Sequence, residues 1–163
     1  MAKAITGRVA GDQPGARQTI CNECGGIAQG AEVLTLDGAL PVEYLMPGDR
    51  VITRTGARKI VRIHVTTLQG PVIAIRPGSL GHNRPERQLL LAPQTRVMLR
   101  DWRAMALYGA KIAMVPVSRL ADGEFIAPVA GAAVQIFCLE TESPEVIYVD
   151  GVEVGIDGAM VTA

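Results

Sequence analysis

Residues 30–54 of the chain read Gly-Ala-Glu-Val-Leu-Thr-Leu-Asp-Gly-Ala-Leu-Pro-Val-Glu-Tyr-Leu-Met-Pro-Gly-Asp-Arg-Val-Ile-Thr-Arg. Two apolar runs of β type, Val33–Leu36 and Val51–Thr53, flank the turn signals Asp37-Gly38 and Pro47-Gly48-Asp49. Apolar runs bounded by such residues are typical of strands joined by tight turns. This stretch therefore predicts short strands that fold back on one another.

The same alternation of apolar runs and turn signals continues to the end of the chain. It predicts an all-β fold of short, twisted, mostly antiparallel strands rather than βαβ units. Only Asp101–Tyr108, with a capping Asp and Gly109 beyond it, predicts one or two helical turns. The predicted strands are Val33–Leu36, Val51–Thr53, Lys59–Thr67, Val72–Arg76, Gln88–Leu91, Arg96–Leu99, Lys111–Val117, Val134–Leu139, Val146–Val149 and Val152–Val154.

Length and composition predict one domain with an aliphatic core. The chain has 163 residues, of which 48% are hydrophobic and only 4% aromatic, so Val, Ile, Leu and Ala must fill the core. Residues 1–25 are polar and lack periodicity, which predicts a flexible N-terminal tail before a β domain at 26–163. We expect one core built from Val33, Val51, Ile60, Ile63, Leu90, Val97, Val115, Ile136 and Val146.

The charge pattern excludes some classes of partner. Sixteen basic and sixteen acidic residues cancel, which leaves no basic surface for nucleic acid. No run of about 18 apolar residues exists, so we expect no membrane span. The first 20 residues lack the apolar segment of a secretory signal. We expect the cytoplasm by default, and the sequence leaves open export by a route that is read at the C-terminus.

The three cysteines leave several interpretations open. Cys21 and Cys24 form a Cys-x-x-Cys pair and Cys138 lies far away; an odd number argues against a disulfide framework. The pair has the spacing of zinc ligands, and Cys138 could complete a set with a histidine. A redox dithiol is less favoured, because no helix N-terminus is evident to lower the pKa of a thiol. Ordinary thiols are the third interpretation, and we expect no metal and no cofactor.

Five segments in order resemble the Hint domain, the module shared by inteins and the self-cleaving half of Hedgehog proteins. Residues 30–54 resemble its opening, and Leu89–Val97 resemble the Leu-Leu-Leu-Ser-Pro-Asp-His-Arg-Val of a bacterial subgroup. The other matching segments are Lys59–Ile63, Trp102–Leu120 and Leu139–Gly151. Together they cover roughly residues 26–156. The resemblance implies the horseshoe-shaped Hint fold, with at most one or two short helices.

The resemblance also implies a chemistry. In this family a Cys thiol attacks the carbonyl just before it and converts an amide into a thioester by an N-to-S acyl shift. A Thr and a His, three residues apart, hold the scissile peptide and protonate the leaving nitrogen. Water or another nucleophile then cleaves the thioester. The reaction therefore needs a nucleophile and a proton donor at two defined positions.

When the resemblance is followed residue by residue, neither the nucleophile nor the proton donor is present. The cysteine position, four residues before Gly30, falls on Gly26, and the Thr and His positions fall on Ala92 and Thr95. A hydroxyl has too high a pKa to replace imidazole. These three residues are therefore predicted to be vestiges of an active site. Cys24, two residues before Gly26, is the alternative nucleophile.

Other polar residues offer weaker candidates. His64 and His82 lie away from the catalytic pattern and are expected to be solvated or singly hydrogen bonded. The acidic residues Asp37, Asp49, Glu140, Glu142 and Asp150 near strand ends could gather a cation, although turn acids usually accept backbone hydrogen bonds, as predicted for Asp49. Arg84, Arg87 and Arg100 could bind an anion or be solvated.

The sequence thus predicts a Hint-like domain that has lost self-cleavage. The expected role is a non-catalytic binding or accessory module whose partner is another protein or a protein assembly. The alternative is an atypical autoprocessing domain that acts through Cys24. The two differ in whether a nucleophile and a proton donor meet in the fold.

Overall fold

The computed structural model describes residues 25–81, 83–130 and 133–158. Within these ranges the chain forms fourteen strands, one α-helix and two short 3-10 helices. The all-β prediction is confirmed. The strands are β1 (Ile27–Ala28), β2 (Glu32–Thr35), β3 (Gly38–Pro41), β4 (Arg50–Thr53), β5 (Gly56–Lys59), β6 (Arg62–Leu68), β7 (Val72–Ile75), β8 (Leu89–Leu91), β9 (Arg96–Leu99), β10 (Ala113–Pro116), β11 (Ile126–Val129), β12 (Val134–Thr141), β13 (Glu145–Val149) and β14 (Val152–Gly158).

Two tight hairpins account for residues 30–59. β2 pairs with β3 and β4 pairs with β5, both antiparallel. A threonine closes each turn: the Thr35 hydroxyl donates to the Gly38 carbonyl at 2.7 Å, and the Thr53 hydroxyl donates to the Gly56 carbonyl at 2.6 Å. The 3-10 helix η2 (Val42–Tyr44) connects the hairpins. The strands expected from residues 30–54 are therefore present.

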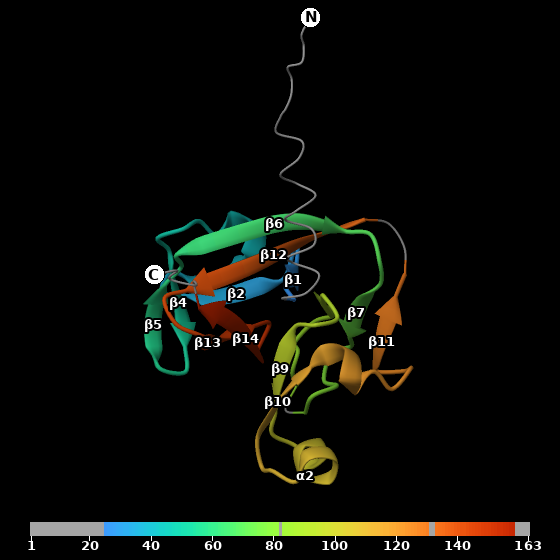
Figure 1. Ribbon diagram of the computed structural model, residues 1–163. Coiled ribbons are helices and arrows are strands. Elements are labelled where there is room, and N and C mark those ends of the chain that lie inside the picture. Colours follow the sequence, from blue (N-terminus) through green and yellow to red (C-terminus); the bar gives the residue numbers. More distant parts are fainter. Residues whose placement is uncertain (1–24, 82, 131–132, 159–163) are drawn as a thin grey trace, which may run out of the picture.

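The long strands β6 and β12 lie side by side across one edge of the domain (Figure 1). They pair antiparallel from Val134 opposite Leu68 to Glu140 opposite Arg62. The pairing of β12 with β14 is parallel, and every other strand pairing of the described residues is antiparallel. The prediction of a mostly antiparallel domain is confirmed.

Some strand boundaries differ from the sequence prediction. The single strand expected over Lys59–Thr67 is two strands, since Ile60 leaves the ladder to donate its N–H to the Asp49 carbonyl at 2.8 Å. β1, β3 and β11 were not predicted. β1 has only two residues and β11 contains Pro128, so neither shows an alternating pattern long enough to recognise.

The predicted helical segment is α2 (Trp102–Tyr108), in the connection between β9 and β10 (Figure 1). Asp101 caps its N-terminus by accepting the Arg103 N–H at 2.9 Å. Gly109 ends it in the left-handed conformation, with φ of 66°. The second 3-10 helix is η3 (Val117–Leu120). No helix in the described ranges has the length and apolar character needed to cross a membrane.

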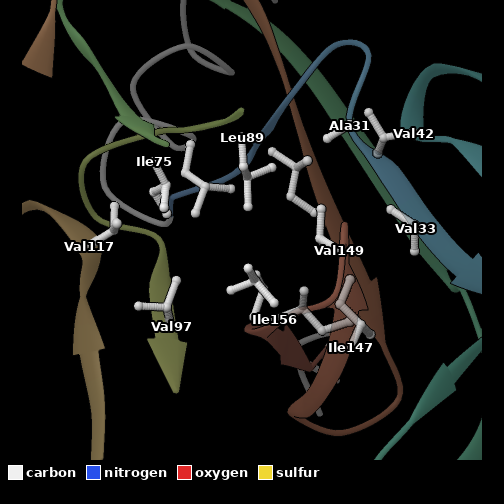
Figure 2. Packing of buried hydrophobic residues seen from close by; sticks show 14 of the residues in the cluster. Ala31, Val33, Val42, Ile75, Leu89, Val97, Val117, Ile147, Val149 and Ile156 are labelled. Carbon is white, nitrogen blue, oxygen red and sulfur yellow. The ribbon is translucent and has the colours of Figure 1, made fainter. Parts of the chain in front are cut away.

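Buried aliphatic side chains from most strands form the main core, part of which Figure 2 shows. The expectation of a single core is wrong, because Ile136 belongs to a second, smaller cluster with Ala28, Leu68, Val72 and Ala92. Leu90, Val146 and Ile63 are only half-buried. In two of these strands, residues on the opposite face are fully buried instead: Leu89, Leu91, Ile147 and Val149. Side chains alternate between faces along a strand, so a pattern read one residue out of phase selects the wrong face.

Candidate functional site

Gly26 and Thr95, the positions matched to the nucleophile and the histidine, are in direct contact. Gly26 precedes β1 and Thr95 precedes β9, 69 residues further along the chain. The Gly26 N–H donates to the Thr95 hydroxyl oxygen at 2.7 Å, and the Thr95 hydroxyl donates to the Gly26 carbonyl at 2.8 Å. Thr95 is 3% exposed. One hydroxyl therefore holds both backbone groups of Gly26 away from water.

Ala92, matched to the threonine position, lies in the same place. Its N–H donates to the Gly26 carbonyl at 3.0 Å, and its own carbonyl accepts the Thr95 N–H at 3.0 Å. This turn between β8 and β9 brings Ala92 and Thr95 to the same glycine. The three positions selected by the sequence resemblance are thus neighbours in space.

The backbone at this point has no room for side chains. A Cβ on Gly26 would lie 2.3 Å from Ile136 Cγ2 and 3.0 Å from Cys138 Sγ, and a Cβ on Gly25 would lie 2.7 Å from Thr95 Cα. Carbon atoms pack no closer than about 3.5 Å without strain. Gly25 was assigned to the tail by the sequence, yet it is buried here. The rest of that tail, residues 1–24, lies outside the described residues.

A cavity of about 30 Å³ remains beside these glycines. Its walls include Gly25, Gly26, Thr95, Cys138 and His64. A volume of this size holds one or two water molecules. The pocket therefore has space for water but is too small for a typical small-molecule ligand.

Cys138 and His64 are residues that sequence reasoning did not connect with this site. The Cys138 thiol donates to the Gly25 carbonyl at 2.8 Å. His64 on β6 lies directly opposite Cys138 on β12, and its Nε2 is 3.4 Å from Glu140 Oε2. Cys138 and Glu140 are two residues apart on one strand, so they share a face. That spacing was visible in the sequence, but the pairing of this strand with β6 was not.

The metal interpretation finds no support in the described part of the chain. There, no group of three or more His, Cys, Asp and Glu residues is placed to hold a metal ion. Cys21, Cys24 and His82 lie outside the described residues.

Most of the other candidate residues have partners within the domain. Asp49 accepts the Met46 N–H at 2.9 Å, which confirms it as a turn former. Arg100 binds both carboxylate oxygens of Glu153, at 2.6 and 2.9 Å, and Arg84 also approaches this carboxylate, at 3.8 Å. The anion that these two arginines contact is therefore the chain's own. Sequence reasoning missed Glu153, whose burial depends on three arginines distant in sequence, the third being Arg54 at 2.6 Å.

Asp150 and Arg87 form a separate pair. Arg87 Nε donates to Asp150 Oδ1 at 3.1 Å, and the Asp150 side chain is 4% exposed. Burial raises the pKa of Asp150 above its usual value, although the hydrogen bond and the charge of Arg87 oppose this shift. The remaining acidic candidates, Asp37 and Glu142, are exposed.

Comparison with known proteins places this arrangement in a family. The Hint domain model matches residues 26–155. The fold is similar to an intein-like domain from the bacterium Clostridium thermocellum (TM-score 0.60, 14% identity, covering 82% of this chain and 98% of that one). It is also similar to the gp41-1 intein (0.57, 11%, 82% and 98%) and to the MchDnaB-1 intein (0.52, 13%, 80% and 99%). No curated protein matches the chain.

The structural likeness at such low identity establishes the Hint fold alone, while the family model covers most of the sequence and begins at Gly26. The chain therefore belongs to the Hint domain family.

Proposed function

We propose that this Hint domain does not cleave itself by the N-to-S acyl shift and serves as a binding module for another protein. The observation that carries the proposal is the pair of hydrogen bonds between the Gly26 backbone and the Thr95 hydroxyl. These bonds occupy the position where the reaction would need a thiol and a proton donor. Both backbone groups of Gly26 are therefore engaged in hydrogen bonds that stabilise the fold, and neither is held by a catalytic group.

Each step of the acyl shift lacks its group. Gly26 has no side chain to attack the Gly25 carbonyl, so no thioester forms at this residue. The leaving nitrogen would be that of Gly26, which already donates to Thr95. The Thr95 proton points instead to the Gly26 carbonyl. Thr95 therefore does not protonate the amine, and its hydroxyl is in any case a poor acid at neutral pH.

The surrounding residues support the same conclusion. Ile136, 1% exposed, fills the space that a Cβ on Gly26 would need. The fold keeps its main aliphatic core, and the smaller cluster that includes Ile136 and Ala92 packs near Gly26. A domain that keeps its core and closes its reactive cleft is suited to presenting surfaces to a partner. The balanced charge of the chain favours a protein over a nucleic acid.

The test is to rebuild the three missing groups in one variant. Gly26→Cys, Ala92→Thr and Thr95→His supply the groups, and Ile136→Ala removes the methyl group that the new Cβ would meet. Incubation with a thiol should then release a fragment that begins at residue 26, detected by intact mass. The rate should be slow, because the groups that orient such residues were not rebuilt.

The matched control carries Gly26→Ala in place of Gly26→Cys. It makes the same steric demand without the thiol and should stay intact. If the rebuilt variant gives a folded-protein NMR spectrum and is never cleaved, the assignment of these positions is wrong. If the control is cleaved as well, the nucleophile lies elsewhere.

The contact between Cys138 and the Gly25 carbonyl favours a second candidate function, self-cleavage of the Gly25–Gly26 bond with Cys138 as the nucleophile. In this reaction Cys138 Sγ attacks the Gly25 carbonyl carbon, and His64 takes the thiol proton and returns it to the leaving nitrogen of Gly26. The bond between Gly25 and Gly26 breaks, and water hydrolyses the Gly25 thioester and releases Cys138. Glu140 orients His64 from the same sheet face.

This route gives the same fragment as the rebuilt variant but needs different residues. Cys138→Ala and His64→Gln would each abolish it in the otherwise unchanged protein, whereas Cys24→Ala would not. Cleavage that depends on Cys24 instead would favour the alternative expected from the sequence. If the unchanged protein stays intact, so that no cleavage depends on Cys138, His64 or Cys24, the result supports the binding role.

A further inference from the structure

A second pocket with an acidic lining shares no residue with the pocket beside Gly25 and Gly26. We use the name acidic hollow for the pocket of about 280 Å³ that is lined by Glu32, Leu34, Ala39, Glu86, Tyr148, Asp150 and Gly151. These residues come from β2, β3, the end of β13 and the connection that precedes β8. Its volume is close to the lower end of the range for small-ligand sites.

Negative charge is in excess in the acidic hollow. Three carboxylates, of Glu32, Glu86 and Asp150, face one guanidinium, that of Arg87. Arg87 lies 3.1 Å from Asp150 and 3.6 Å from Glu32, and Glu86 has no ion pair among the described residues. The nearby Arg84 approaches Glu153 instead. The described residues therefore do not neutralise this pocket.

Asp150 gives a second, independent indication of a missing partner. Its side chain is only 4% exposed, and its Oδ1 accepts a hydrogen bond from Arg87. Oδ2 is buried and, among the described residues, accepts no hydrogen bond. Buried carboxylate oxygens normally have a donor, because an unsatisfied one costs about 1–3 kcal/mol. Asp150 is part of the wall of the acidic hollow, so this unpaired oxygen belongs to a residue of that wall.

The apolar part of the lining limits what kind of cation fits. Leu34, Ala39 and Tyr148 contribute apolar surface, which a bare metal ion would not use, and the described residues contain no group of three ligands placed for a metal. Basic side chains combine an apolar stem with a cationic head. A guanidinium adds planar, bidentate hydrogen bonding to carboxylates and attraction to an aromatic ring.

We propose that the acidic hollow binds an arginine side chain of a partner protein, with the stem on Leu34 and Tyr148 and the guanidinium between Glu86 and Asp150. This inference gives the binding role proposed above its partner chemistry. It rests on the binding role and not on the loss of self-cleavage. The two are tested separately, because cleavage is measured by intact mass and binding by NMR.

The test is an NMR titration of the full chain with N-acetyl-arginine amide. The uncharged analogue N-acetyl-citrulline amide, similar in shape, is the control ligand. The arginine ligand should give saturable shifts of the backbone amides of Leu34, Tyr148 and Gly151, and the citrulline ligand should not. The shifts should weaken as salt is raised, because the carboxylates of Glu32 and Glu86 are reached by solvent.

Two conservative variants locate the site. Glu86→Gln should weaken arginine binding about fivefold, which corresponds to the loss of one partly exposed charge pair. Glu142→Gln changes the net charge equally at an exposed position outside the hollow and should leave binding unchanged. The Glu86 side chain forms no ion pair with the other described residues, so its variant keeps the test valid even if Asp150→Asn disturbs folding.

Three results would overturn the proposal. Equal shifts with arginine and citrulline would show that charge plays no part. An equal loss of binding in Glu86→Gln and Glu142→Gln would show diffuse attraction to the surface. Concentration-dependent shifts of these amides without any ligand, lost in Glu86→Gln, would assign the hollow to a basic residue of a second copy of this chain.

Discussion

Removing the Thr95 hydroxyl should destabilise the domain more than its size suggests. Thr95→Val keeps the shape of the side chain and deletes both hydrogen bonds to Gly26. The Gly26 carbonyl still accepts from Ala92, so losing the Thr95 donor there costs about 0.5–1.5 kcal/mol. The Gly26 N–H is left buried without a partner, which costs about 1–3 kcal/mol. We expect a loss of about 2–4 kcal/mol in the free energy of unfolding.

The assay is urea unfolding followed by circular dichroism, supported by thermal melts. A loss of this size should lower the melting temperature by about 5–10 °C in a domain of this length. Thr95→Ser keeps the hydroxyl, loses only a methyl group and should cost about 1 kcal/mol. If Thr95→Val and Thr95→Ser are equally stable, the hydroxyl does not hold Gly26 and the reasoning fails.

Three further predictions concern buried polar groups. Thr66→Val should leave stability unchanged or raise it by up to about 1 kcal/mol in urea unfolding, because the Thr66 hydroxyl is buried and has no hydrogen-bond partner among the described residues; a clear loss would mean that it does have one. Glu153→Gln should cost about 2 kcal/mol, less than the 3–5 kcal/mol of a fully buried pair because its arginines are about one-third exposed, whereas Asp157→Asn in an exposed pair should change the melting temperature little; equal effects would contradict the burial argument. For Glu145, burial works to raise the pKa of the carboxyl, but hydrogen bonds from Thr55, Arg58 and Ser143 outweigh it and lower the pKa, so its stabilisation is complete above the unfolded pKa of about 4.3 and is lost as pH falls through the lower folded value. The stability difference between the wild type and Glu145→Gln should therefore be constant from neutral pH to about pH 5 and shrink in more acidic solution; a difference that grows on acidification would reverse the sign of the pKa shift.

The sequence predicted the fold well where turns and alternation coincide. The strands β2 and β4 flank the predicted turns at Asp37-Gly38 and Pro47-Gly48-Asp49, and α2 carries both of its predicted caps, Asp101 and Gly109. These signals are local, so they can be read from neighbouring residues. They failed at β1 and β11, whose pairing partners β12 and β7 are distant in sequence, and at β3 (Gly38–Pro41), which has no run of strand-forming residues.

The same distinction applies to the site. The proximity of Gly26 and Thr95 followed from the motif resemblance, which carries long-range information that no local pattern contains. The contacts of Cys138 with Gly25 and of Glu153 with three arginines could not be predicted, because they depend on strand pairings and side-chain directions. The acidic hollow was likewise invisible, since Glu86 and Tyr148 are separated by more than sixty residues.

The central claim is that the unchanged protein keeps the Hint fold without its self-cleavage. Its most direct test is the intact mass of the purified full chain, followed for days at neutral pH with and without a strong thiol or hydroxylamine. We predict a single species of full-length mass under every condition. A fragment that begins at Gly26, formed faster in the presence of the nucleophile, would contradict the account and show that a thioester forms at Gly25.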